Sequence, residues 1–326
     1  GMDYAGIEDR YFVAVFLPDA DSGAKVATRY WKLMREVKIA EKTEQEPVAE
    51  MAAGSGTADP VSLLVYAGPK DYEQLKKMNP PLHALVQFGW MEFIADPLFH
   101  ALKWTHRYIP NWGWAIIVLT LVINMVLFPM RISSYRTMLK MRKVAPEVSA
   151  IKERYKKYKL NDPKKAEENK EVMALYKREG VNPLGGCLPM VLQLPVFIGL
   201  YYSLRSSMDL RQAPFFGWIN DLSAPDQLFV VHGFEFPVRV LPLVMGVTMF
   251  VQQRITPMQA DPAQARMMMI VMPVMMTVLF YQFPSGLVLY WLVSNLLASG
   301  HQYWLTRTPA TAVEPMAPAS RERNKR

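Results

Sequence analysis

The sequence predicts an α-helical polytopic membrane protein with part of an extracytoplasmic β domain at its N-terminal end. Five apolar runs of roughly 14 to 21 residues follow residue 111, and none of them contains Asp, Glu or Lys. Before residue 70, shorter β-type runs alternate with polar stretches that contain Gly and Pro. A basic segment between the first two apolar runs carries the pattern of a cytoplasmic helical hairpin.

Composition alone does not distinguish a membrane protein from a soluble one. Hydrophobic residues make up 51% of the 326 residues, charged residues make up 20%, and the mean hydropathy is +0.03. The clustering of the apolar residues therefore decides the class. Because Cys187 is the single cysteine, no intrachain disulfide forms, and the histidines show no metal-ligand spacing. We expect no cofactor and no metal. The histidines are His83, His100, His106, His232 and His301.

Residues 1–80 are predicted to be the C-terminal part of a β domain. The β-type runs are 11–18, 27–34 and 61–69, and a short polar helix follows Pro69.

Residues 81–110 are predicted to contain an amphipathic helix lying along the membrane interface. The stretch 88–109 places several apolar and aromatic residues near one helical face, as interfacial helices do. The alternative is an ordinary helix packed on the β domain. The residues of this face are Trp90, Phe93, Ile94, Ala101, Trp104 and Tyr108.

Residues 111–306 are predicted to form a five-span membrane core, followed by a basic tail, 307–326. The first span has 19 residues, which rise roughly 28 Å as a helix, close to the hydrocarbon thickness of a bilayer. The third and fourth spans are short, so either they extend into flanking residues or the bilayer thins around them. The five spans are 112–130, 184–204, 240–253, 267–283 and 286–305.

The loops predict the orientation of the core. The hairpin segment 135–180 contains fourteen Lys and Arg residues, whereas the loop 207–236 contains only Arg211. Because Lys and Arg accumulate in cytoplasmic loops, the hairpin and the C-terminus are expected in the cytoplasm and the β domain outside it. This topology explains most of the net charge of +8, so direct nucleic-acid recognition is not expected.

Within the hairpin segment, apolar residues at spacings of three and four predict two packed helices around a break at "NDP". Asp162 is the expected N-cap of the second helix, Pro163 its first residue, and Gly180 its end. The first helix should pack through Met141, Val144, Val148, Ile151, Tyr155 and Tyr158, and the second through Ala166, Asn169, Met173 and Tyr176.

The spans contain neutral polar side chains in place of the acidic groups of coupled transporters. Thr120, Asn124 and Arg131 lie on one face of the first span, Gln193 lies in the second, and the fifth has neighbouring Ser294 and Asn295. An unpaired amide in hydrocarbon costs several kcal/mol. These groups therefore either bond across a dry helix interface or line a wet cavity, and the cationic end at Arg131 favours the cavity.

No pattern supports an enzyme, and no catalytic residue is predicted. The "GSG" at 54–56 lacks the strand and helix of a nucleophile elbow, and a pairing of Ser294 with His301 on one helix is a weak alternative. Methionine is abundant at 22 residues, with the densest cluster at 266–277. Such a cluster serves helix packing, or a surface that accepts many apolar sequences.

Several stretches together resemble the YidC/Oxa family of membrane protein insertases. They are "YKREGVNPLGGCLPMVLQLPVFIGLYYSLRSSMDLRQAPFFGWINDLSAPD" (176–226), "LPLVMGVTMFVQQ" (241–253) and "FPSGLVLYWLVSN" (283–295). "LVYAGPKDYEQL" is similar to the closing edge of the family's periplasmic β-sandwich domain. The resemblance implies a five-helix insertase core in the cytoplasmic (inner) membrane, with a hydrophilic groove open to the cytoplasm and to lipid. It also implies that this chain is a fragment lacking the first helix and much of the periplasmic domain.

The resemblance implies the partners and the groove residues. The partners are nascent membrane proteins, the Sec translocon, the lipid bilayer and, for the basic tail, the ribosome. Family members commonly have an arginine five residues before the proline of the first core span, where this chain has Asn124. We hypothesise that hydration matters more than charge there and that Arg131 attracts acidic client tails. The substrate groove is expected to contain Thr120, Asn124, Arg131, Gln193, Phe197, Tyr290 and Trp291.

Two other functions remain open at this level. A channel or transporter could be built around the same polar cavity, although no internal repeat of the kind found in many transporters is present. A purely structural anchor for translocon assembly is the second rival. The sequence favours an insertase and membrane chaperone over both.

Overall fold

The protein is described by a computed structural model whose residues fall into two compact units. One unit comprises Gly1–Phe99 with Ile198–Arg211, and the other comprises His100–Phe197 with Gln212–Arg326. The described residues are 5–9, 11–18, 26–39, 42–55, 63–78, 82, 85–86, 88–159, 162–182, 185, 188–231, 236–255 and 267–307. The basic tail beyond residue 307 lies outside them.

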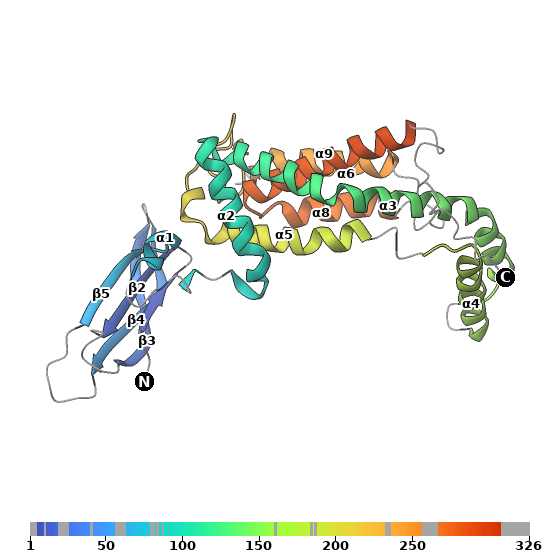
Figure 1. Ribbon diagram of the computed structural model, residues 1–326. Helices are drawn as coiled ribbons and strands as arrows, with labels where there is room; N and C mark the ends of the chain where they lie inside the picture. Colours follow the sequence, from blue (N-terminus) through green and yellow to red (C-terminus); the bar gives the residue numbers. More distant parts are fainter. Residues whose placement is uncertain are drawn as a thin grey trace, which may run out of the picture. The chain divides into compact units, whose positions relative to one another are not determined.

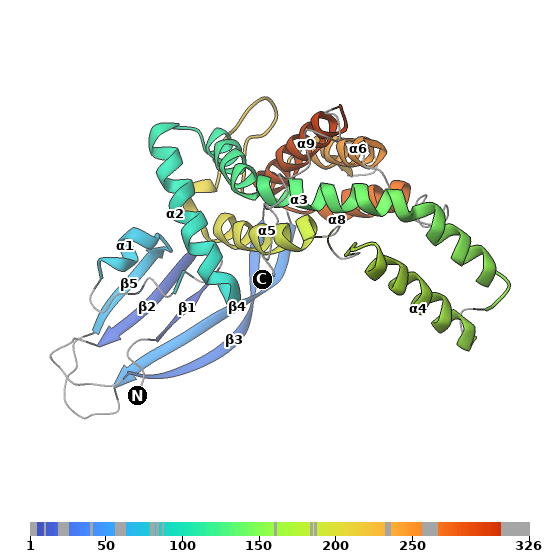
Figure 2. The same cartoon turned by 45° about the vertical axis from the view of Figure 1, so that its right-hand side comes forward.

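The first unit is built from antiparallel strands (Figure 2). The three-stranded sheet has the order β1-β2-β5, and β3 pairs with β4 in a separate two-stranded ribbon. The predicted β-type runs fall within β2, β3 and β5, so the antiparallel β character is confirmed. The strands are β1 (Ala5–Glu8), β2 (Phe12–Pro18), β3 (Val26–Ile39), β4 (Lys42–Ser55) and β5 (Leu63–Pro69).

The core of this unit forms where one face of β2 meets two helices. Val13, Val15 and Leu17 alternate along β2, so their side chains share one face of the sheet, and all three are buried. They belong to one apolar cluster with Leu75 of α1 (Tyr72–Lys76) and Phe99 of α2 (Glu92–Tyr108). The first turns of α2 therefore pack on the β domain.

Helix α2, preceded by the short 3₁₀ turn η2 (Gly89–Met91), packs by its first turns on the β domain, which was one of the two alternatives, and the interfacial position stays a prediction. Its inner face is buried, yet the predicted aromatic residues Trp90, Phe93, Trp104 and Tyr108 are all exposed. The predicted face was too wide, because Ile94 and Ala101 are partly buried. A helix that packs by one face and exposes aromatic rings on another is typical of interfacial segments.

Apolar helices make up most of the second unit (Figure 1). Helices α3 and α6 both pack along α9, and α8 packs along α6. Each predicted span corresponds to a helix; the ends of the last four differ by a few residues, whereas the first helix continues to Tyr155, well beyond the predicted end at residue 130. The fourth begins with a π-helical turn. The helices are α3 (Trp112–Tyr155), α5 (Leu188–Ser206), α6 (Val240–Ile255), η5 (Met267–Val271), α8 (Met272–Phe280) and α9 (Ser285–Arg307).

The outer surfaces of these helices are strongly apolar. Met125 and Val126 of α3, Val191 of α5, Val247 of α6 and Val278 of α8 are all exposed. By length and composition, α3 is the one helix of the described part that could cross a membrane, and α6 and the η5–α8 segment are shorter apolar helices. Exposed apolar faces on several neighbouring helices favour a lipid surrounding over water.

A connection with short regular elements joins α5 to α6. It contains η4 (Met208–Leu210) and the short antiparallel pair β6 (Phe229–Val231) and β7 (Phe236–Val238). The buried Asp226 accepts hydrogen bonds from the backbone N–H groups of Val240 (2.8 Å) and Leu241 (3.0 Å). Asp226 thus satisfies donors at the start of α6 that the helix itself leaves unpaired.

Helix α3 continues without interruption into the hairpin. Its 44 residues include Pro129 and Pro146, so the predicted boundary between span and hairpin is not a break in the helix. Helix α4 (Pro163–Arg178) then folds back along its end (Figure 2). Asp162 caps α4 by accepting from the Lys164 N–H at 2.9 Å, and Gly180 has φ +63°, which confirms the predicted start and stop.

The hairpin core confirms one predicted helix face and corrects the other. Val144, Val148 and Ile151 of α3 are buried against Leu175 of α4, as predicted for the first arm. The predicted seam of the second arm is wrong at three of its four residues, because Ala166, Asn169 and Met173 are exposed, while Tyr176 packs against the core as predicted. The observed seam uses Val172 and Leu175, whose branched apolar side chains gain more from burial than those of Ala166 and Asn169.

We predict that Leu175→Ala lowers the free energy of opening of the hairpin by about 2 to 3 kcal/mol, because it leaves a cavity in this small core. Leu175 is 6% exposed, whereas Met173, two residues earlier, is 58% exposed. Met173→Ala is therefore the matched control, with an expected effect below about 0.5 kcal/mol. Amide hydrogen exchange over residues 141–178 measures the change in opening free energy for both variants. A larger effect of Met173→Ala than of Leu175→Ala would favour the helix face predicted from the sequence.

Candidate functional site

The first group of site residues lies between α3 and α9. Thr120 and Asn124 are one turn apart on α3, and Asn124 is only 2% exposed. The Asn124 Nδ2 donates to the Thr120 carbonyl (2.8 Å) and to Ser294 Oγ on α9 (3.3 Å). The Thr120 hydroxyl donates to the Ile116 carbonyl at 2.6 Å. Asn124 thus bonds directly across the helix interface, which is the dry arrangement that the sequence allowed and not the wet cavity that it favoured.

One atom of this group remains unsatisfied. The Asn124 Oδ1 is buried and accepts no hydrogen bond from any residue that the structure describes. A buried carbonyl oxygen without a donor costs on the order of 1 to 3 kcal/mol in proteins. The site therefore retains a capacity to accept a hydrogen bond at the centre of the apolar helices.

The second group connects three helices through one amide. The Gln193 Nε2 on α5 donates to the Tyr290 hydroxyl on α9 (2.5 Å), and Gln193 Oε1 accepts from the Arg131 guanidinium on α3 (3.4 Å). Tyr290 is fully buried, whereas Gln193 and Arg131 are partly exposed. Two hydrogen bonds therefore connect the buried Tyr290 hydroxyl, through Gln193, to the partly exposed Arg131.

The remaining predicted residues form an aromatic cluster beside these polar groups. Phe197 of α5 lies edge-on to Trp291 of α9, with ring centroids 5.0 Å apart, and 5.5 Å from Phe280 of α8. Phe280 also contacts Trp291 at 5.2 Å. Such tilted ring contacts stabilise the packing of three helices beyond their buried area.

The seven predicted residues therefore all belong to the second unit, in two polar groups and one aromatic cluster. Ser294, which the sequence marked only as a polar residue of the last span, is the direct partner of Asn124. Its signal was its position one turn after Tyr290, which places both on one face of α9. Among the described residues, no three His, Cys, Asp or Glu side chains are arranged to hold a metal ion.

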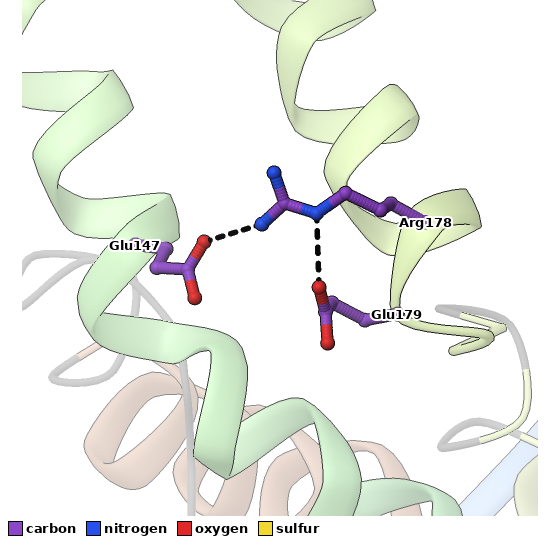
Figure 3. A network of polar contacts seen from close by, with 3 residues as sticks. All are labelled: Glu147, Arg178 and Glu179. Atoms are coloured by element: carbon purple, nitrogen blue, oxygen red, sulfur yellow. Dashed lines mark hydrogen bonds and ion pairs between the residues drawn. The ribbon is translucent and has the colours of Figure 1, made fainter.

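The hairpin carries a separate network of ion pairs. Arg178 donates to Glu147 of α3 at 2.9 Å and to Glu179 at 3.0 Å (Figure 3). The hydrogen bond to Glu179, with the charge of Glu147, raises the pKa of the Arg178 guanidinium above its usual range. The hydrogen bond from Tyr155 to Glu171 likewise raises the pKa of the Tyr155 hydroxyl. These exposed pairs favour the closed hairpin only weakly.

One unit therefore combines exposed apolar helices with buried polar groups, and the other contains antiparallel strands, a combination typical of a membrane protein with an additional β domain. Residues 104–312 match the family model described as 60Kd inner membrane protein, and residues 1–101 match that of the YidC periplasmic domain. The chain therefore belongs to the YidC family of inner membrane proteins, which confirms the resemblance seen in the sequence.

Curated relatives and a solved structure agree with this assignment. The chain is 46% identical over 263 residues to the membrane protein insertase YidC of Cupriavidus taiwanensis, covering 81% of this chain and 44% of the relative. It is 43% identical over 314 residues to that of Syntrophobacter fumaroxidans, covering 94% and 54%. The chain thus spans about half the length of these relatives. A crystal structure of active YidC insertase with its first transmembrane domain resolved has a TM-score of 0.54 at 22% identity, covering 93% of this chain and 63% of that one, which supports the fold.

We predict that Asn124 and Ser294 are energetically coupled across α3 and α9. In a double-mutant cycle with Asn124→Ala and Ser294→Ala, the free energies of unfolding should be non-additive by about 0.6 kcal/mol and at most about 1.7, the range for hydrogen bonds inside membranes. Reversible unfolding in detergent–lipid micelles measures this coupling.

A second cycle provides the control. Thr277 donates within its own helix, to the Pro273 carbonyl at 2.8 Å, so Asn124→Ala and Thr277→Ala should be additive. Additivity in the Asn124–Ser294 cycle would mean that the two side chains do not interact.

Proposed function

We propose that this chain is the core of a membrane protein insertase and chaperone. It inserts nascent membrane proteins into the cytoplasmic membrane through a groove formed by α3, α5 and α9, alone or beside the Sec translocon. The names of the relatives support this proposal, and so does the match of the membrane part to the family model. No covalent chemistry and no cofactor are part of it.

The polar contact from Arg131 through Gln193 to Tyr290 is the observation that carries the proposal. A hydrophilic client segment loses its hydration when it enters hydrocarbon, at a cost of several kcal/mol for each unpaired polar group. Partly exposed polar side chains that continue into the helices offer replacement hydrogen bonds along the way. The exposed apolar faces of α5 and α8 then receive the apolar part of the client without a comparable cost.

Arg131 supplies the charge of the groove in this proposal. Its guanidinium makes a single long hydrogen bond, 3.4 Å to Gln193, and is partly exposed. An arginine held loosely at an edge can exchange that bond for a shorter, charge-assisted bond to a carboxylate. Asn124, at the position where the family resemblance implies an arginine, contributes neutral hydrogen bonding instead.

The proposed topology places the β domain, 1–80, in the periplasm, with the interfacial helix in 81–110 at headgroup depth. The core, 111–306, lies in the membrane, and the hairpin and the tail, 307–326, lie in the cytoplasm. The match of residues 1–101 to a periplasmic domain model supports the first assignment, and the exposed aromatic rings of α2 support the second. Client capture by the hairpin and ribosome contact by the tail belong to the same proposal.

Reconstitution tests the function directly. Purified protein in translocon-free lipid vesicles should insert a small client with a polar N-terminal tail, while protein-free vesicles should not. The rival channel or transporter would instead release a trapped small solute from the same vesicles. Solute release without insertion would contradict the proposal and favour a channel or transporter. If the vesicles show neither insertion nor solute release, the structural-anchor function is favoured.

We predict that Asn124→Leu reduces insertion of this client at least tenfold, because it removes the amide that bonds to Ser294 and keeps the centre of the groove polar. Asn124→Arg should retain insertion, since a guanidinium restores donors at the same place. Val122→Leu, at an exposed apolar position of α3, is the matched control. Full insertion by the Asn124→Leu variant would show that Asn124 has no role in the proposed groove.

We also predict that Arg131→Gln selectively slows clients with acidic tails. The rate should fall about five- to tenfold for a tail with two Asp residues and less than twofold for its Asn counterpart, because only the first loses a charge-assisted bond. Arg131→Lys should recover part of the difference. Equal losses for both tails would show that Arg131 acts through packing alone.

A further inference from the structure

Helix α9 carries a second row of polar groups that the network described above does not use. Five side-chain atoms on it are buried and have no hydrogen-bond partner among the described residues; His301 Nδ1 lies on another face of the helix, and the other four form the row. These four are Trp291 Nε1, Asn295 Nδ2, Ser299 Oγ and Gln302 Nε2. Asn295 is 9% exposed, so its amide is nearly as enclosed as that of Asn124.

These four residues follow one another at spacings of four, four and three, and therefore share one face of the helix. At about 100° per residue they fall within roughly 80° of one another, on a face distinct from that of Tyr290 and Ser294. Successive members rise roughly 6, 6 and 4.5 Å along the axis. The row is thus about 16 Å long, and its last interval is shorter than the first two.

The chemistry of the row favours a hydrogen-bond acceptor. An indole N–H can only donate, the two amide nitrogens are donors, and a serine hydroxyl can donate. Buried donors left unpaired in an apolar surrounding cost several kcal/mol each by transfer estimates. A ligand that presents acceptor oxygens at a spacing of about 6 Å would match the first three donors, with Gln302, whose side chain is longer, about 4.5 Å further along.

An extended polypeptide presents such a pattern. Along one edge of an extended chain, carbonyl oxygens repeat every second residue, or about every 6.6 Å, close to the roughly 6 Å rise of the donor row. The row also begins at Trp291, which belongs to the aromatic cluster of the groove. From there it runs toward the C-terminal end of α9, the cytoplasmic end in the proposed topology.

We propose that the donor row of α9 binds the backbone carbonyl oxygens of an extended client segment. This inference rests on the proposed insertase function and deepens it, because it assigns how a polar tail is held whatever its sequence. Backbone carbonyls are common to all clients, so recognition through them is independent of side chains. Arg131 and the donor row then have different roles: the cation binds acidic side chains, and the row binds the backbone.

Photo-cross-linking tests the proposal with the protein reconstituted in vesicles. A client with a photoreactive residue in its polar tail should cross-link to residues 291–302, as mapped by mass spectrometry. In the variant Asn295→Leu with Gln302→Met, the yield should fall about five- to tenfold, the change expected for two hydrogen bonds inside a membrane. The variant Gln302→Met alone keeps the size of the side chain, and its cross-linking yield should fall about threefold. It tests the proposal even where the double variant does not fold.

Two further arms identify the recognised group. A tail with N-methylated backbone keeps its carbonyl oxygens and should cross-link as well as the unmodified tail. The control Thr248→Val removes a hydroxyl that donates within its own helix, to Met245 at 2.7 Å, and should leave the yield unchanged. An unchanged cross-linking yield in the double variant would overturn the proposal, and water or lipid esters would then be the ligands of the row. Loss of cross-linking with the N-methylated tail would also overturn it.

The proposed function and this inference fail separately. If wild-type protein does not insert the client, the insertase function fails. If wild-type protein inserts it and Asn124→Leu abolishes insertion, while the α9 variants cross-link normally, only the role of the donor row is wrong.

Discussion

Gln193 links three helices of the apolar unit through the two ends of a single amide. Its nitrogen donates to Tyr290 on α9 and its oxygen accepts from Arg131 on α3. In an apolar surrounding, where a polar group without a partner is costly, such contacts fix which helix faces meet. The same constraint explains why Asn124 lies against Ser294 and not toward the exterior.

Polar groups inside and apolar groups outside invert the arrangement of a soluble protein. The exposed faces of α3, α5, α6 and α8 are rich in Val, Leu and Met, so lipid can surround them at little cost. The interior supplies hydrogen bonds that a hydrophilic segment would otherwise lack. The uninterrupted helix α3 carries Asn124, Arg131 and the first arm of the hairpin, so the proposed groove and the hairpin share one continuous helix.

The sequence predicted the elements well, because apolar run length and capping residues are local signals. Each predicted span is a helix, and Asp162 and Gly180 mark the ends of the second hairpin helix as predicted. The seam of that helix was misplaced, because Ala166, Asn169 and Met173 have the same spacing as the true seam and only the partner helix distinguishes them.

The sequence predicted which residues belong to the site better than it predicted which of them bond to each other. Thr120, Asn124 and Arg131 share a face by spacing alone, Gln193 was marked by its polarity within an apolar span, and the family resemblance supplied Tyr290. The bond from Asn124 to Ser294 depends on how α3 and α9 are rotated about their axes, which no local pattern encodes. The donor row of α9 escaped notice because Ser299 and Gln302 are ordinary residues until burial leaves them without partners.

Water access along one helix tests the central claim most directly. Gln193 belongs to the polar network, while Val191, two residues earlier on α5, is 61% exposed on an apolar surface. With Cys187 replaced by serine, Gln193→Cys and Val191→Cys can be labelled in membranes with an impermeant thiol reagent, which requires a hydrated thiolate. The account predicts labelling at 193 at least tenfold faster than at 191; equal rates, or faster labelling at 191, would contradict it.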